Sequence, residues 1–144
     1  MRALADGGAV AAMTVADGRI TLAAPARRIQ AGLPFTHEIV PLPPAQTGGQ
    51  GLPPGKAVRL VRAHFRVLDT RALYIDTGRG PTSVPFRRFG KASFDAEPPP
   101  FSGDVRVRAL GWSADPMTPL WRIHQDVPLP CTVLSVATEV KLAD

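Results

Sequence analysis

Apolar and polar residues alternate most regularly in the stretch from residue 61 to residue 67. Every second position is apolar, namely Val61, Ala63, Phe65 and Val67. Basic residues fill the positions between them, namely Arg62, His64 and Arg66. Because successive side chains of a β-strand point to opposite faces, this period of two predicts a strand with one packed face and one wet face. A turn at 69–71 then leads into an apolar run at 72–76, which predicts an antiparallel hairpin.

Three later stretches have the same character. Alternation is equally clean over residues 104–110, and the segments 120–126 and 131–140 are rich in apolar and β-branched side chains, which favour strands. A short β-like piece at 83–89 has no partner that the pattern assigns.

The N-terminal part contains two Asp-Gly pairs, at residues 6–7 and 17–18, each beside a β-prone run. Both residues of such a pair tolerate positive φ, so the pairs favour tight hairpin turns and predict a β-meander. Residues 28–35 follow as an extended segment, which Gly32 and Pro34 interrupt as in an edge strand or a bulge.

The expected fold is all-β, an antiparallel sandwich or barrel-like arrangement of about eight short strands. The chain has 144 residues, the size of one ordinary domain, so residues 1–144 are expected to form a single β-domain. With 16 prolines and 13 glycines it is interrupted too often for long helices. Pro/Gly-rich residues 41–55 and Pro-rich residues 90–100 are expected to be loops.

The formal net charge of +5 makes an anionic partner worth considering. Alternation predicts that four arginines face outward from strands, and they are the candidate face for an anionic ligand or a glycan: Arg62, Arg66, Arg106 and Arg108. The competing interpretation is a solvated polar face, since long basic side chains flank many half-buried strands. Aromatic residues make up only 6% of the chain, too few to stack on exposed bases.

No residue pattern points to a cofactor or a metal ion. The single cysteine, Cys131, excludes an internal disulfide and lies in an apolar strand-like context that favours a buried structural thiol. His37, His64 and His124 lie on separate segments without metal-ligand spacing. The first residues include an acid and two glycines, so no secretory signal is expected, and no apolar run reaches the length of a membrane span.

The sharpest enzymatic hint is the segment 73–78, whose Asp76-Thr77-Gly78 resembles the signature of retropepsin-like aspartic proteases. In that family two such aspartates meet across a dimer and share a proton. Arg79 departs from the pattern, because the family favours a small residue there and a cation opposes proton sharing. The alternative is an Asp-Thr-Gly turn after a strand, and no enzymatic activity is predicted.

Four blocks in order along residues 15–142 resemble the C-terminal domain of phage tail nozzle proteins, also called tail tubular protein B. They are the stretch 17–36, the strand 56–71, the element 101–105 and the element 123–134. The motif residues are Gly32, Leu33, Pro34, Phe35, Gly103, Asp104, Gln125, Asp126, Pro128, Leu129 and Pro130. Their Gly and Pro residues suit backbone turns, and Asp126 is expected to cap one.

This resemblance implies a virion structural protein, made in the cytoplasm of a bacterial host and acting through contacts with other tail proteins. It implies a homo-oligomer, hexameric in the family, that forms part of a DNA conduit and touches DNA transiently. Family members are several hundred residues long and include a β-propeller and an attachment platform. The chain corresponds to the terminal domain alone, which leaves open whether it carries the ring-forming surfaces.

Overall fold

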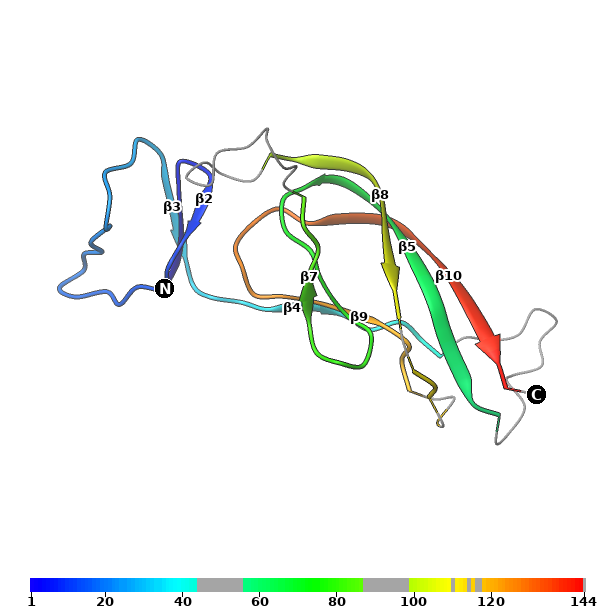
Figure 1. The fold of residues 1–144 in the computed structure, drawn as a ribbon. Coiled ribbons are helices and arrows are strands. Elements are labelled where there is room, and N and C mark those ends of the chain that lie inside the picture. The colour runs from blue at the N-terminus through cyan, green and yellow to red at the C-terminus, as the bar shows by residue number, and fades with distance from the viewer. Residues whose placement is uncertain (44–55, 87–98, 110, 114, 116–117, 144) are drawn as a thin grey trace.

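The computed structural model describes residues 1–43, 56–86, 99–109, 111–113, 115 and 118–143 (Figure 1). These ranges hold ten strands and no helix, and hence no helix long and apolar enough to cross a membrane. The strands are β1 (Arg2–Ala5), β2 (Gly8–Val10), β3 (Ile29–Gly32), β4 (His37–Ile39), β5 (Val58–Thr70), β6 (Tyr74–Asp76), β7 (Thr82–Ser83), β8 (Phe101–Arg108), β9 (Arg122–Gln125) and β10 (Thr132–Leu142). The predicted all-β class is confirmed.

The strands form three antiparallel sheets, ordered β2-β1-β3, β10-β5-β8 and β4-β9-β6-β7. The second and third sheets face each other as a sandwich, while the first projects to one side (Figure 1). The sandwich core is apolar and draws on both of its sheets: Leu60, Ala63, Phe65, Val67, Leu73, Ile75, Ala109, Trp121 and Ile123. At its centre the rings of Phe65 and Trp121 meet edge to face, with centroids 5.2 Å apart.

The long strand β5 carries a bulge at Val61, and this corrects the predicted alternation. In the pairing with β10, Arg62 lies opposite Glu139 and Leu60 opposite Val140, so Val61 has no partner. An extra residue on one strand reverses the alternation beyond it. The packed face therefore uses Leu60 on one side of the bulge and Ala63 on the other, and Val61 is only partly buried.

The predicted hairpin between 61–67 and 72–76 is wrong, because β6 belongs to the opposite sheet. The chain leaves β5 at Thr70, a buried residue whose hydroxyl donates to the carbonyl of Thr132 and accepts from its N–H. Arg71 then donates its N–H to the carbonyl of Pro130. Leu73 is fully buried by this crossing, which brings β6 beside β9 and β7.

Residues 1–32, which we call the arm, contain the projecting sheet. Asp6 and Gly7 both have positive φ in the β1–β2 turn, as predicted. The connection from β2 to β3 crosses the sheet, and it holds the second Asp-Gly turn, closed by the paired backbone of Ala16 and Arg19. The β-prone run 20–22 forms no strand, so the meander is confirmed only for its first hairpin.

The other predicted strands are confirmed in outline. β8 alternates partly buried and exposed side chains without a break, β9 falls within the predicted segment 120–126, and β10 covers most of the segment 131–140 and continues to Leu142. The extended segment 28–35 becomes the edge strand β3 followed by an irregular stretch. Of the piece 83–89 the structure describes residues 83–86, and among these only Ser83 lies in a strand. Most of the expected loops 41–55 and 90–100 lie outside the described residues.

Replacing Phe65 by Ala is expected to lower the free energy of unfolding by about 3–5 kcal/mol, because it leaves a cavity beside Trp121. Urea denaturation followed by tryptophan fluorescence measures this change. Leu68→Ala on the same strand is the matched control, since Leu68 is 44% exposed and its truncation should change stability by less than about 1 kcal/mol. Equal losses of stability for the two variants would contradict the packing described above.

Candidate functional site

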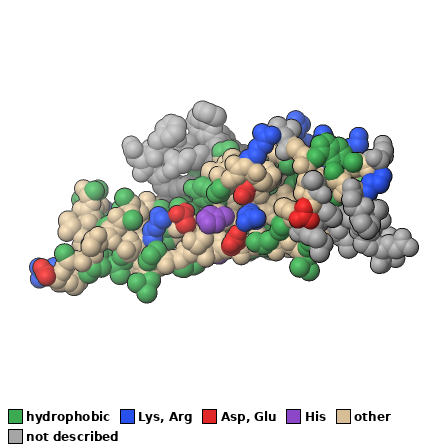
Figure 2. Space-filling model, turned by 90° about the horizontal axis from the view of Figure 1, so that it is seen from below, with side chains coloured by type: hydrophobic (Ala, Val, Ile, Leu, Met, Phe, Trp, Pro, Cys, Tyr) green, Lys and Arg blue, Asp and Glu red, His purple; other side chains and the backbone are tan. Residues whose placement is uncertain are grey.

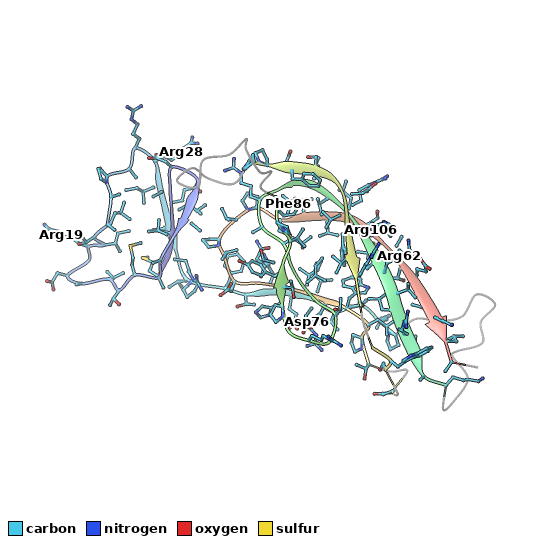
Figure 3. All side chains as sticks on the ribbon, in the orientation of Figure 1. Arg19, Arg28, Arg62, Asp76, Phe86 and Arg106 are labelled. Carbon is cyan, nitrogen blue, oxygen red and sulfur yellow. The ribbon has the colours of Figure 1, made fainter. Side chains whose placement is uncertain are left out.

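The outer face of the sheet β10-β5-β8 gathers the predicted arginines. Register places Arg62 beside Arg108, His64 beside Arg106, and Arg66 beside Asp104. Residues paired in this way point to the same side of a sheet. All four arginines therefore share one solvent-facing surface, as the alternation predicted, and Figure 3 shows Arg62 and Arg106 on their neighbouring strands.

Two of the four arginines are neutralised by acids on adjacent strands. Arg66 donates from Nε and Nη2 to the two carboxylate oxygens of Asp104, at 2.8 and 3.0 Å. Arg62 pairs with Glu139 at 2.7 Å. Within the described part of the chain, Arg106 and Arg108 have no ion-pair partner. Of these four arginines, the two without an ion pair therefore both lie on β8.

The hydrogen bonds from Arg66 hold the pKa of the Asp104 carboxyl below its ordinary value. In return, the carboxylate raises the pKa of the guanidinium. Both side chains are exposed, so the pair is screened by salt and adds little to stability. The effect of this ion pair is to fix the positions of the Arg66 and Asp104 side chains on the outer face.

A second surface is apolar and lies where the arm meets the sandwich. Every residue from 27 to 36 is exposed, a run we call the exposed segment. It includes Leu33, 83% exposed, Phe35, 67% exposed, and Ile29, 48% exposed. Figure 2 shows hydrophobic side chains along the narrow N-terminal end of the molecule. Such a concentration of exposed apolar side chains is typical of an interaction site.

The four motif residues Gly32, Leu33, Pro34 and Phe35 lie within the exposed segment, not in the core. Ile29 was not among the predicted site residues. The signal that would have identified it is the apolar period of two at 29, 31, 33 and 35, which fits a strand packing on a core equally well. The sequence did not show that this stripe lies outside the sandwich.

The motif elements in the sandwich have structural roles. Gly103 has a φ of 150°, and a Cβ there would lie 3.2 Å from Cζ of Phe101. The buried amide of Gln125 donates to the carbonyls of Val127 (3.4 Å) and Leu129 (2.8 Å), which fixes the path of the Pro128–Pro130 turn.

Asp126, expected to cap that turn, instead pairs with Arg2 of β1 at 2.9 Å. This ion pair joins the arm to the sandwich. Across the strand pair β4–β9, His37 lies opposite Gln125. The buried His37 Nε2 and Gln125 Oε1 have no hydrogen-bond partner among the described residues.

Asp76 closes a loop. One of its carboxylate oxygens, Oδ1, accepts the N–H groups of Gly78, Arg79 and Gly80 at 2.7–3.0 Å. Gly78 has positive φ, as such a turn requires. This geometry supports the turn interpretation of Asp76-Thr77-Gly78, and Figure 3 shows Asp76 at the lower edge of the sandwich in this view.

The remaining candidate groups are dispersed. Cys131 is half-buried against the core, and burial raises the pKa of its thiol, which disfavours the nucleophilic thiolate. The histidines stand on β4, β5 and β9. Among the described residues, no group of three or more His, Cys, Asp or Glu side chains is placed to hold a metal ion.

Comparison with known proteins does not assign the chain to a family. No protein-family model matches the chain, and no curated protein matches it significantly.

The lowered pKa of Asp104 gives a testable pH dependence. Arg66→Gln should raise the Asp104 pKa toward its ordinary value, because the charged hydrogen bonds are removed; NMR titration of the carboxyl carbon measures it. A lowered folded-state pKa stabilises the fold above the unfolded-state value of about 3.9, and this contribution disappears as pH falls through the folded value. Arg106→Gln is the matched control, and a shift as large as that of Arg66→Gln would contradict the pairing.

Proposed function

We propose that the protein is a non-enzymatic assembly module of a phage tail or tail-like structure, which works by docking its exposed segment onto another protein. The observation that carries the proposal is the ten-residue run 27–36, exposed throughout although it contains Ile29, Leu33 and Phe35. Keeping large apolar side chains in water is unfavourable, so burying them against a partner stabilises the bound state.

The backbone of this region supports the same proposal. β3 is an edge strand of the arm, and β4, which follows the exposed segment, is an edge strand of the sandwich. An edge strand has unpaired N–H and C=O groups that another chain can pair with. Exposed apolar side chains and unpaired backbone N–H and C=O groups therefore lie in the same region of the chain.

The tail assignment rests on the ordered motif resemblance, whose Gly32–Phe35 block lies in the exposed segment itself. That resemblance supports a place in the virion, contacts with other tail proteins, and a homo-oligomer that is hexameric in the family. A role in a DNA conduit, with transient DNA contact, is part of the same proposal.

Replacing both Leu33 and Phe35 by Asp should abolish docking, because charged side chains would then be buried in the interface. The test is co-expression with the products of the genes that neighbour this one, followed by co-purification. Val15→Asp is the matched control, since Val15 is a 45% exposed apolar residue of the arm outside the segment. The proposal fails if the double variant co-purifies as wild type does while its thermal unfolding is unchanged.

A second candidate function is the binding of an anionic polymer or glycan by the outer face of β10-β5-β8. The observation that favours it is the pair Arg106 and Arg108, side by side on β8 without ion-pair partners in the described ranges, with His64 adjacent. Unneutralised guanidinium groups on an open face bind phosphate or sulfate groups well.

Arg106→Ser with Arg108→Ser should weaken binding to duplex DNA or heparin and flatten its dependence on salt. For duplex DNA the slope of log K against log salt should fall by about 0.9 for each phosphate that the variant no longer neutralises. Arg19→Ser with Arg27→Ser removes the same charge from the arm and is the control. If both double variants show the same slope, the face has no specific role and only net charge matters.

A further inference from the structure

We propose that the partner of this surface is a second copy of the chain, paired through residues 28–38 in antiparallel register about a two-fold axis at Leu33. We call residues 28–38 the pairing segment. The inference rests on the proposed function and narrows it: the partner of the exposed segment is a second copy, in a two-fold contact separate from the contacts that would close a hexameric ring. An interface of this kind is isologous, so each side chain must suit its symmetry-related neighbour.

The pairing segment joins two edge strands. It begins beside the edge strand β3, ends within the edge strand β4, and contains no residue with positive φ. The rings of Phe35 and His37 touch, with centroids 5.3 Å apart, so side chains two residues apart lie on one side. Residues 33–36, between the two strands, belong to no strand in the single chain and would become extended on pairing, which would give a span of about 36 Å.

The side chains are self-complementary in one register, in which residue numbers of paired positions add to 66. Leu33 then meets Leu33 of the second copy, and small Ala31 meets large Phe35. On the opposite side of the pairing, Arg28 meets Glu38 at both ends. Apolar pairs thus occupy the centre of one face, and opposite charges stand at both ends of the other.

The neighbouring register lacks this match. A two-fold axis at Gly32 would place Arg28 opposite Thr36 and Arg27 opposite His37, which pairs no cation with an acid. Charge therefore selects the axis at Leu33, as cross-strand charges commonly select register.

Both charged side chains are available for the pairing. The guanidinium of Arg28 has no ion pair among the described residues, and Figure 3 shows Arg28 at the outer end of β3. Glu38 contacts Arg122 through Oε1 at 3.5 Å, the long limit of a hydrogen bond. The second copy's Arg28 would give Glu38 a further cation.

Disulfide cross-linking tests the register. In a Cys131→Ser background, Leu33→Cys should form a covalent dimer on mild oxidation, because the two Cβ atoms lie opposite each other at the axis. Ala31→Cys and Phe35→Cys should cross-link when mixed, whereas Phe35→Cys alone should cross-link at least tenfold more slowly. Val15→Cys is the control for random collision. Unfolding curves of each variant establish that it is folded.

Charge exchange tests the pairs at the ends. Arg28→Glu alone and Glu38→Arg alone should each weaken the dimer by about tenfold, since like charges would meet, and the double variant should restore it. Light scattering over a range of protein concentrations measures the dimer. Restoration by the double variant is an effect that mere loss of folding does not produce.

Two outcomes overturn the inference. One is a mass that stays monomeric at every concentration with no Leu33→Cys cross-link. The other is a dimer in which Ala31→Cys cross-links to itself as fast as Leu33→Cys, which would place the axis elsewhere. If the protein is monomeric but Leu33→Asp with Phe35→Asp still abolishes co-purification with a tail protein, the inference falls while the proposed function stands.

Discussion

The contact between Phe65 and Trp121 is the constraint on which the rest of the molecule depends. It joins the two sheets of the sandwich at their centres, because Phe65 lies on β5 and Trp121 immediately before β9. With the inner face of β5 fixed by this packing, its outer face is fixed as well, since strand side chains alternate. The basic face is therefore a geometric consequence of the core.

The bulge at Val61 shows how closely the two faces are coupled. Without the extra residue, Leu60 and Ala63 could not both point inward, because they lie three positions apart. With this one inserted residue, the strand places apolar side chains in the core on both sides of the bulge, while its basic side chains point to the solvent. The arm has no comparable support, since Ala3 is its one fully buried residue among those described.

Local patterns predicted the elements well where one side of a strand is wet. The alternation in 104–110 and the Asp-Gly turn at 6–7 both have purely local causes, and both were predicted. The partner of β6 was not, because the turn at 69–71 looks like a hairpin connection until the buried hydroxyl of Thr70 joins it to β10. Pairing of this kind depends on residues about sixty positions away, which no local pattern contains.

The candidate surfaces were likewise predicted only in the features that have local causes. The outward direction of the four arginines follows from periodicity, whereas the neutralisation of Arg62 and Arg66 depends on which acids lie on neighbouring strands. The exposure of Ile29, Leu33 and Phe35 could not be predicted, because period-two apolar residues have the same pattern whether they face a core or the solvent. Only the separation of the arm from the sandwich distinguishes the two cases.

The ion pair between Arg2 and Asp126 has a mechanical consequence. It bridges arm and sandwich at their junction, and a surface pair of this type contributes only about 0–1 kcal/mol. Beside it, residues 33–36 belong to no strand, and Pro34 fixes only its own φ. The connection between arm and sandwich therefore has less to hold it than the sandwich itself, whose two sheets share an apolar core.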